Sequence, residues 1–308
     1  MKTVLITGGT GLVGSSLTKI LVEKNYNVII LSRNKKTSSN NKIKFAQWNI
    51  ENQTIDNWAI EEADFIVHLA GASVSEKRWT EKRKKEIVES RTKSSSLIVG
   101  ALNNISNNVK AVISASAIGW YGIDTEHSLI NGFVESDDAD DNFLGSTCKL
   151  WEESVQPVVE LNKRLVILRM GVVLSNRAGA YVEFIKSLKF KVAAILGNGK
   201  QIISWIHIDD VCDIFIKAIE DESLKGTYNC VAPNPVSNKY FMNQLGKIYL
   251  NDFFIPFYIP SFLIKLMLGD FSIEVLKSTK VSSKKIENTS FQFKYKTIEA
   301  AIEQLKKN

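Results

Sequence analysis

A glycine-rich stretch near the N-terminus has the residue types and the spacing to bind a phosphate. Gly8, Gly11 and Gly14 stand between an apolar run that predicts a strand, residues 4–6, and a helical pattern that includes Leu17. In that context the first glycine permits a tight turn, the second lets backbone approach a diphosphate, and the third lets helix and strand pack. Backbone N–H groups at the positive end of the helix dipole then attract the anion. We therefore predict a dinucleotide site made by Gly8, Thr10, Gly11, Leu12, Val13 and Gly14.

The end of the next predicted strand, residues 27–31, indicates which dinucleotide fits. An NAD site usually places Asp or Glu there to accept from the ribose 2′-hydroxyl. This chain has Ser32 and Arg33 instead. A guanidinium can pair with a 2′-phosphate, and such a charge-assisted contact is worth roughly 1.5–3 kcal/mol. NADP(H) is therefore favoured over NAD(H), with an exposed Arg33 that binds nothing as the alternative.

Strand and helix patterns alternate through the first half of the chain and would position these residues. Further strands are predicted at 43–48, 64–68, 109–113 and 164–169, and a long helix at 79–102. This alternation predicts an α/β fold with a parallel, doubly wound sheet of the Rossmann type. Small residues after the fourth strand, Leu69, Ala70 and Gly71, would leave room for the cofactor. Ser116 and Tyr121 follow the fifth strand at the same edge of the sheet.

Composition excludes several classes of protein. The chain has 308 residues, of which 44% are hydrophobic, and 39 basic against 33 acidic residues give a net charge of +6. Much of the basic excess is lysine spread along predicted helices, so solvated faces are favoured over a nucleic-acid surface. Three cysteines without a Cys-x-x-Cys pair predict a reducing compartment without disulfides or zinc. The three histidines lack ligand spacing, so no metal is expected. The N-terminus resembles no signal peptide and no apolar stretch suits a membrane span, which together predict a cytoplasmic protein.

The motifs of the chain resemble the extended branch of the short-chain dehydrogenase/reductase superfamily, the NAD-dependent epimerase/dehydratase family. Within it they are similar to the uncharacterised epimerase-like oxidoreductases with a C-terminal domain of unknown function. The resemblance covers essentially the whole chain. It is carried by Leu69-Ala70-Gly71, Arg78-Trp79-Thr80, Ser90-Arg91, residues 114–119, Phe143-Leu144, Cys148, Trp151-Glu152 and residues 169–175, 197–199, 204–210, 232–236 and 291–293.

The resemblance also implies two domains. A Rossmann domain would comprise residues 1–171, completed by about 206–231 and the C-terminal helix. A smaller C-terminal substrate lobe would comprise residues 172–205 and 232–308. In the segment 206–231, Asp209 is a credible helix N-cap, and His207 is expected to cap or anchor a loop rather than to catalyse. The apolar stretch 253–268 is expected to be core, with a substrate pocket or a dimer surface as alternatives.

Superfamily chemistry implies a Tyr four residues before a Lys on one helix, with a Ser or Thr from the fifth strand orienting the substrate carbonyl. Lys149 fits the lysine, which binds the nicotinamide ribose, and Ser116 fits the hydroxyl. Arg169 is also predicted to bind the cofactor. Glu153 follows where the superfamily often has an acid. Gly145, however, stands where the tyrosine is expected.

Three interpretations of Gly145 compete. Tyr121 could supply the phenol, or it could be a wall of the substrate pocket. An acid in the loop 135–141 or Cys148 could serve instead, although a cysteine on such a helix is more typical of a small buried hydrophobe. Finally, the protein could bind NADP(H) without hydride transfer, as a sensor or partner-binding protein.

We therefore expect an NADP(H)-binding, epimerase-like oxidoreductase that acts on an unidentified small molecule. The candidate catalytic residues are Ser116, Tyr121 and Lys149. The non-catalytic NADP(H)-binding protein is the alternative, and a homodimer is left open.

Overall fold

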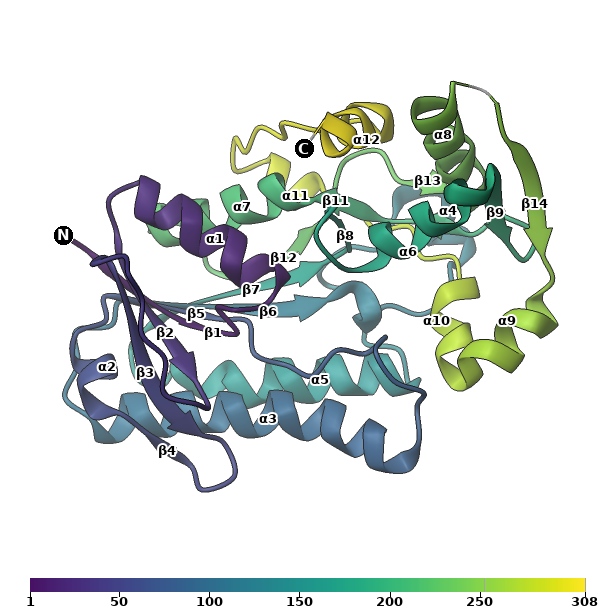
Figure 1. The fold of residues 1–308 in the computed structure, drawn as a ribbon. Helices are drawn as coiled ribbons and strands as arrows, with labels where there is room; N and C mark the ends of the chain where they lie inside the picture. Colours follow the sequence, from purple (N-terminus) through teal and green to yellow (C-terminus); the bar gives the residue numbers. More distant parts are fainter. Residues whose placement is uncertain (252, 308) are drawn as a thin grey trace.

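A computed structural model of the chain describes residues 1–251 and 253–307, and its centre is an eight-stranded sheet (Figure 1). The strand order is β12-β7-β6-β5-β1-β2-β3-β4, and neighbours are parallel except for β3 and β4. The strands are β1 (Thr3–Thr7), β2 (Asn27–Ser32), β3 (Ile43–Asn49), β4 (Thr54–Ile55), β5 (Phe65–His68), β6 (Ala111–Ala117), β7 (Arg164–Met170) and β12 (Gly226–Cys230). The order reverses between β1 and β5, and ligands of such sheets bind at the carboxyl ends of the strands beside that point.

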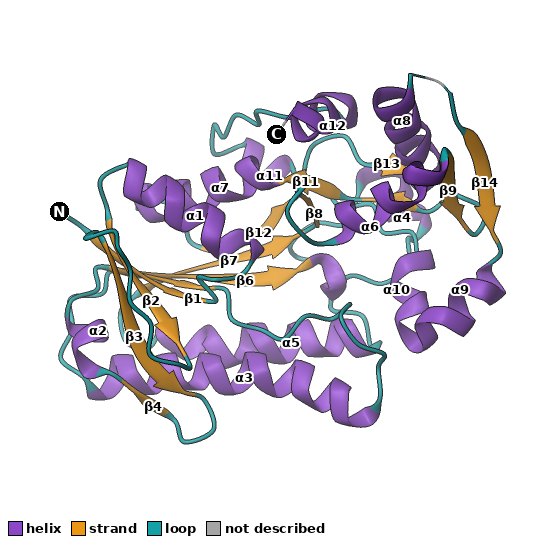
Figure 2. Ribbon diagram, in the orientation of Figure 1, coloured by secondary structure: helices purple, strands orange, loops and turns teal. Residues whose placement is uncertain are grey.

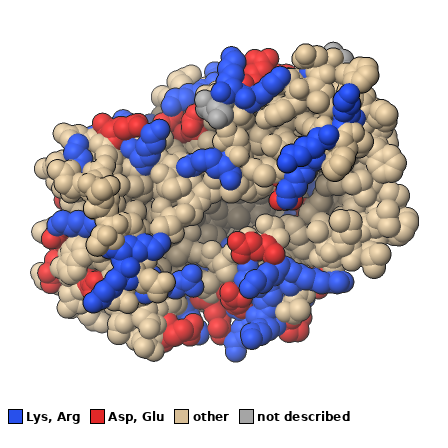
Figure 3. Space-filling view, in the orientation of Figure 1, with Lys and Arg blue, Asp and Glu red and all other residues tan. Residues whose placement is uncertain are grey.

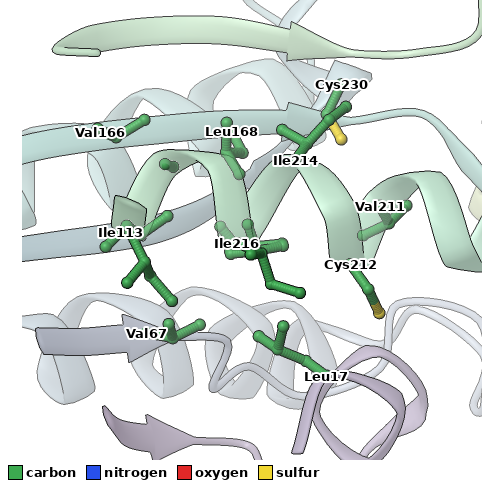
Figure 4. Close-up of a cluster of buried hydrophobic side chains, with 14 of the residues drawn as sticks. Leu17, Val67, Ile113, Val166, Leu168, Val211, Cys212, Ile214, Ile216 and Cys230 are labelled. Atoms are coloured by element: carbon green, nitrogen blue, oxygen red, sulfur yellow. The ribbon is translucent and has the colours of Figure 1, made fainter. Parts of the chain in front are cut away.

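Helices cover both faces of the sheet (Figure 2). Helices α1 (Leu12–Glu23), α7 (Ile208–Glu220) and α11 (Lys284–Glu287) pack on one face, and α2 (Asn57–Glu61), α3 (Glu81–Asn104) and α5 (Phe143–Val155) on the other. Alternate residues of a strand enter different cores: Val4 and Ile6 meet α1 and α7, and Leu5 meets α3. Figure 4 shows the first core, with Leu17 and Ile214 facing the sheet. Burial on both faces explains why the strands are continuous apolar runs.

The predicted strands and the parallel, doubly wound sheet are confirmed. The fifth strand differs most from its prediction. It begins at Ala111 and continues to Ala117, because Ser114, Ala115 and Ser116 stay buried and pair with β7. The N-cap of α7 is also corrected, since His207 rather than Asp209 precedes the helix and its Nδ1 accepts from the Asp209 N–H at 3.1 Å.

A second lobe follows β7 and has its own apolar core. Its strand pairs are β8 with β11, β9 with β14, and β10 with β13. Their bounds are β8 (Val172–Leu174), β9 (Val192–Leu196), β10 (Ile202–Ile203), β11 (Trp205–His207), β13 (Val236–Ser237) and β14 (Ile255–Ile259). The remaining helices are α4 (Glu126–Asn131), α6 (Ala180–Lys186), α8 (Asn238–Leu250), α9 (Ser261–Leu268), α10 (Ser272–Leu276) and α12 (Ile298–Lys307), and the 3-10 turns are η1 (Ile118–Trp120), η2 (Gln156–Val158), η3 (Ser187–Phe190) and η4 (Gly269–Phe271).

The C-terminal segments divide between the two cores differently from the expectation. Ile298, Ile302 and Leu305 of the final helix α12 share the core of the second lobe with α8, rather than joining the Rossmann sheet. In contrast, Ile286 of α11 and the following Phe291 are buried in the core beneath α7. The residues 284–293 therefore pack with the Rossmann domain.

The apolar stretch 253–268 is not core, which corrects the expectation. Phe253 is 71% exposed, Phe262 68% and Met267 73%, whereas Ile264 is buried. Strand β14 lies at the edge of its two-stranded sheet. Ile255 donates to the Lys191 carbonyl at 2.9 Å and the Ile259 carbonyl accepts from Gly197 at 2.9 Å, so the alternate residue Pro256 faces the open edge. No helix within the described ranges is long and apolar enough to cross a membrane.

Candidate functional site

The glycine turn lies between β1 and α1, beside the point where the strand order reverses. Gly8 has φ +67°, and a Cβ there would lie 2.9 Å from the Leu69 carbonyl oxygen. A Cβ at Gly14 would lie 2.3 Å from the Gly8 carbonyl oxygen, so this glycine lets α1 pack against the turn. Gly11 is the N-cap of α1 and offers no side chain to the first N–H groups of the helix. The turn therefore provides a close-fitting backbone cradle with donors for an anion.

The loop Leu69–Gly71 lies against the glycine turn and is held by Thr7. The Thr7 hydroxyl oxygen accepts from the N–H groups of Leu69 at 2.9 Å and Ala70 at 3.0 Å. It donates in turn to Nδ1 of His68 at 2.8 Å, and Nε2 of His68 lies 3.2 Å from the Ser95 hydroxyl. Burial lowers the pKa of His68 to about 4. His68 is thus a neutral histidine that shapes the cofactor loop.

The end of β2 presents basic side chains to solvent. Arg33 is exposed, and within the described ranges the arginine ion pairs involve Arg83 and Arg169 but not Arg33. The Ser32 hydroxyl accepts from the Asn34 N–H at 3.3 Å and so shapes the turn. Residues 34–37 and β3 line a cavity of about 530 Å³, to which Lys35 and Lys36 contribute. Asp56 lines the same cavity, so its wall carries one acidic and two basic side chains.

Ser116, Tyr121 and Arg169 meet in a buried network instead of lining an open cleft. The Ser116 hydroxyl donates to Glu152 Oε1 at 2.6 Å. Arg169 donates to the same carboxylate from Nε at 2.8 Å and from Nη2 at 3.0 Å. The guanidinium also stacks over the Trp120 ring, with Cζ 3.6 Å from its centroid. This two-point ion pair fastens β7 to α5.

The Tyr121 hydroxyl is committed to the same network. The side chain is 0% exposed, and its hydroxyl lies 2.8 Å from Asn229 Oδ1, 3.0 Å from the Val134 carbonyl and 3.0 Å from Nη1 of Arg169. Burial raises the pKa of the phenol to about 12. These contacts argue against Tyr121 as a proton donor and give it a structural role. Ser116 and Arg169 are also buried, and both are hydrogen-bonded to Glu152. Their positions therefore give no evidence for direct contact with substrate or cofactor.

Helix α5 was expected to turn positions 145 and 149 toward the end of the sheet, but it presents a different pair of residues there. Lys149 is exposed, whereas Cys148 and Glu152 are buried. A Cβ at Gly119, just after β6, would lie 3.2 Å from Leu144 Cβ and 3.6 Å from Cys148 Sγ. The residues four apart that face the end of β6 are thus Leu144 and Cys148. The buried acid is Glu152, not Glu153. Cys148 and Glu152 are four residues apart, so the sequence could have placed both on the inner face of α5. The prediction instead followed the chemistry of the Lys149 side chain.

Gly145 is closed to any side chain. A Cβ there would lie 2.0 Å from the Asp140 carbonyl oxygen, because the chain before α5 folds back over the first helical turn. The Asp140 N–H donates to the Trp120 carbonyl at 2.8 Å, and its carboxylate accepts from the Asn142 N–H at 2.7 Å. The space is therefore occupied by a fixed segment of backbone. Cys148 offers no easy substitute for a phenol, because burial raises the pKa of its thiol to about 12.

One basic residue of the second lobe reaches the glycine turn and was missed in the sequence. Arg177 donates through Nη2 to the Leu12 carbonyl at 3.2 Å and also contacts the Ser16 hydroxyl. It follows β8 in a loop, where spacing gives no signal.

Figure 3 shows a hollow near the middle of the face drawn there, close to the carboxyl ends of the central strands, with basic and acidic side chains at its rim.

The sequence comparisons agree with this geometry. The model of the NAD dependent epimerase/dehydratase family matches residues 4–230. The chain belongs to this family. A domain of unknown function, DUF1731, matches residues 259–305.

Relatives and solved structures span the whole chain. It is similar to the epimerase family protein YfhF of Bacillus subtilis, with 32% identity over 98% of this chain and 97% of the relative. The epimerase family protein SSP1921 of Staphylococcus saprophyticus is 34% identical over 99% of both chains. Among solved structures, the human epimerase family protein SDR39U1 with NADPH has a TM-score of 0.87 and 25% identity, and covers 99% of both chains. The fold and the extended short-chain dehydrogenase/reductase assignment are thereby confirmed.

Proposed function

We propose that the protein binds NADP(H) in preference to NAD(H) and acts as an epimerase-like oxidoreductase on an unidentified small molecule. The observation that carries the proposal is the backbone cradle of Gly8 and Gly14 at the N-terminus of α1, which a single Cβ would fill. Family membership supports a nicotinamide dinucleotide, and the NADPH in the solved structure of the human relative supports the phosphorylated form. Three free, buried cysteines support a cytoplasmic setting.

The chain's own residues suggest how the cofactor would be held. The N–H groups of Leu12 and Val13 would bind the diphosphate, and Arg33 would pair with the 2′-phosphate. Leu69–Gly71 would pack against the dinucleotide, because Thr7 holds that loop beside Gly8. When bound, the cofactor supplies a hydride, and a carbonyl substrate then needs a proton at its oxygen.

The source of that proton is the point where the two candidate functions separate. Leu144 and Cys148 face the end of β6, and neither is a ready acid at neutral pH. We propose an acid of the loop 135–141 as donor, and Asp140 is the member tested, because its backbone carbonyl lies against Gly145 and its carboxylate lies beside Gly122. A non-catalytic NADP(H)-binding sensor or partner-binding protein is the second candidate, favoured by the apolar pair on α5.

The cofactor preference can be tested by fluorescence titration and thermal shift with NADPH and NADH. We expect NADPH to bind at least about tenfold more tightly, corresponding to about 1.4 kcal/mol, and Arg33→Ala to abolish the difference. Lys19→Ala, an exposed lysine on α1 paired with Glu23, is the matched control. Equal binding of the two dinucleotides to the parent protein would rule out the 2′-phosphate assignment.

Catalysis can be tested by following deuterium from 4-deuterated NADPH into products across a panel of aldehydes, ketones and nucleotide-sugar ketones. Transfer that Asp140→Asn slows, while NADPH affinity is retained, would support the oxidoreductase. Tight NADPH binding without transfer to any member of the panel would favour the non-catalytic candidate.

A further inference from the structure

Arg91 on α3 is a largely buried guanidinium without an acidic partner. Within the part of the chain that the structure describes, arginine ion pairs involve Arg83 and Arg169 only. Arg83, on the same helix, shows the usual arrangement, with Nη1 2.7 Å from Glu86. Burial lowers the pKa of Arg91, and no carboxylate lies within ion-pair distance of it in the described ranges. Its Nε and Nη2 are not among the buried polar atoms that lack a partner, so these donors remain accessible to a ligand.

The Arg91 side chain is held in place from one side only. Its Nη1 donates to the Ile87 carbonyl at 2.8 Å and to the Ala72 carbonyl at 3.1 Å. Its guanidinium lies over the Trp151 ring, with Cζ 4.9 Å from the ring centroid. No protein acceptor within the described ranges is bonded to Nε or Nη2. Two carbonyls and a ring thus orient the fork, and its other donors remain for a ligand.

The guanidinium stands at the edge of the predicted cofactor site. A Cβ at Gly71 would lie 3.1 Å from Cζ and 3.4 Å from Nε of Arg91, so the glycine lets the cation approach the loop after β5. That loop touches Gly8, whose missing Cβ faces Leu69. On its other side Arg91 lies over the ring of Trp151, which is one helical turn after Cys148 on α5. Arg91 therefore lies between the glycine turn and the end of β6.

The strand order shows which half of a dinucleotide this position serves. Strands run β6-β5-β1-β2 along the sheet, and the glycine turn follows β1. Arg33 at the end of β2 marks the side of the adenosine 2′-phosphate. Arg91, beside the loop after β5 and near α5, stands on the opposite side of the diphosphate. The half of the molecule that reaches there is the nicotinamide nucleotide, which carries a phosphate and ribose hydroxyls that a guanidinium can bind.

We propose that Arg91 binds the nicotinamide nucleotide half of NADP(H), through the phosphate and ribose on that side, and so supplies from α3 the cation that α5 lacks. This inference rests on the proposed NADP(H) binding. Lys149 points to solvent, and Cys148 occupies the inward position on α5. A guanidinium can take the place of that ammonium at the ribose hydroxyls, and its fork can also donate two hydrogen bonds at once to the adjoining phosphate.

The test compares NADPH with adenosine 2′,5′-bisphosphate, which has the adenosine half and lacks the nicotinamide nucleotide. Affinities are measured by titration calorimetry for the parent chain, Arg91→Met, Arg91→Lys and Arg33→Ala. We expect Arg91→Met to weaken NADPH binding by at least about tenfold and to leave the bisphosphate within about twofold, with Arg91→Lys intermediate. Arg33→Ala should weaken both ligands. Lys93→Ala, on the exposed face of the same helix and paired with Glu51, should change neither.

The ratio of the two affinities in one variant separates a binding role from a structural one, because partial unfolding lowers both affinities equally. An unchanged ratio in Arg91→Met, with or without loss of stability, would overturn the proposal. A parent chain that binds the bisphosphate but not NADPH would overturn it too. A parent chain that binds neither ligand would refute the proposed cofactor itself, which is a different result.

Discussion

Gly145 offers the sharpest test of the structure, because an alanine there should do the opposite of what helix propensity predicts. Within a helix, Gly→Ala ordinarily stabilises by about 0.5–1 kcal/mol. At Gly145 the new methyl carbon would lie 2.0 Å from the Asp140 carbonyl oxygen and 2.7 Å from its carbonyl carbon. Both are backbone atoms, and the segment is tied to Trp120 and Asn142 by hydrogen bonds. Overpacking of this kind costs typically about 1–3 kcal/mol.

Subtracting the propensity gain of about 0.5–1 kcal/mol from the overpacking cost of about 1–3 kcal/mol leaves, for Gly145→Ala, a loss of up to about 2.5 kcal/mol in the free energy of unfolding. Gly100→Ala is the matched control, since Gly100 lies in α3 and an added Cβ would meet nothing within 4 Å. That variant should gain about 0.5–1 kcal/mol. Urea unfolding followed by circular dichroism measures both. Equal stabilisation of the two variants would refute the close approach of Asp140. The same contact predicts that Gly145→Tyr will not increase hydride transfer, because the loop leaves no room for the phenol.

Three further predictions concern buried polar groups. The pKa of His68 falls from 6.5 to about 4 on folding, so the unfolded chain binds the proton first, and the protein should lose about 3 kcal/mol of stability as pH falls from 6.5 to 4. The free energy of unfolding, measured at several pH values in that range, should change less with pH in His68→Gln than in the parent protein. An equal pH dependence in the two proteins would contradict the assignment. The thiols of Cys148, Cys212 and Cys230 are buried with raised pKa values, so a thiol reagent should modify them only after denaturation, and rapid labelling of the native chain would refute this burial. Tyr121→Phe should lower the free energy of unfolding by about 1–3 kcal/mol, because Arg169 and Asn229 lose a buried hydrogen-bond partner. The affinity for NADPH should stay the same. A large loss of NADPH affinity with unchanged stability would instead place Tyr121 in the binding site.

The sequence was most informative where local chemistry decides the structure. The glycines of the first turn and the apolar strand runs could both be recognised, because turns and burial leave marks on neighbouring residues. The parallel sheet followed from the alternation of strands and helices. These features depend on contacts close in sequence or on burial alone.

The candidate site was harder to predict because it depends on which way each side chain points and on contacts between residues far apart in the sequence. Lys149 was chosen for its chemistry, although the buried spacing of Cys148, Trp151 and Glu152 places it on the outer face of α5. Tyr121 follows β6 as expected, but its partner Asn229 comes from β12, more than a hundred residues later. The pairing of Arg169 with Glu152 is equally invisible in spacing. Residue type alone therefore could not determine which polar groups face a ligand.

Pro256 in the edge strand has a consequence for how the protein behaves in concentrated solution. An exposed strand with apolar side chains invites pairing with a copy of itself, which is the first step of aggregation. The open edge of β14 presents Pro256, which has no N–H to donate, so a neighbouring chain would find the hydrogen-bonding ladder interrupted at that position. The lobe can thus expose the apolar side chains of residues 253–268 while resisting growth into fibres.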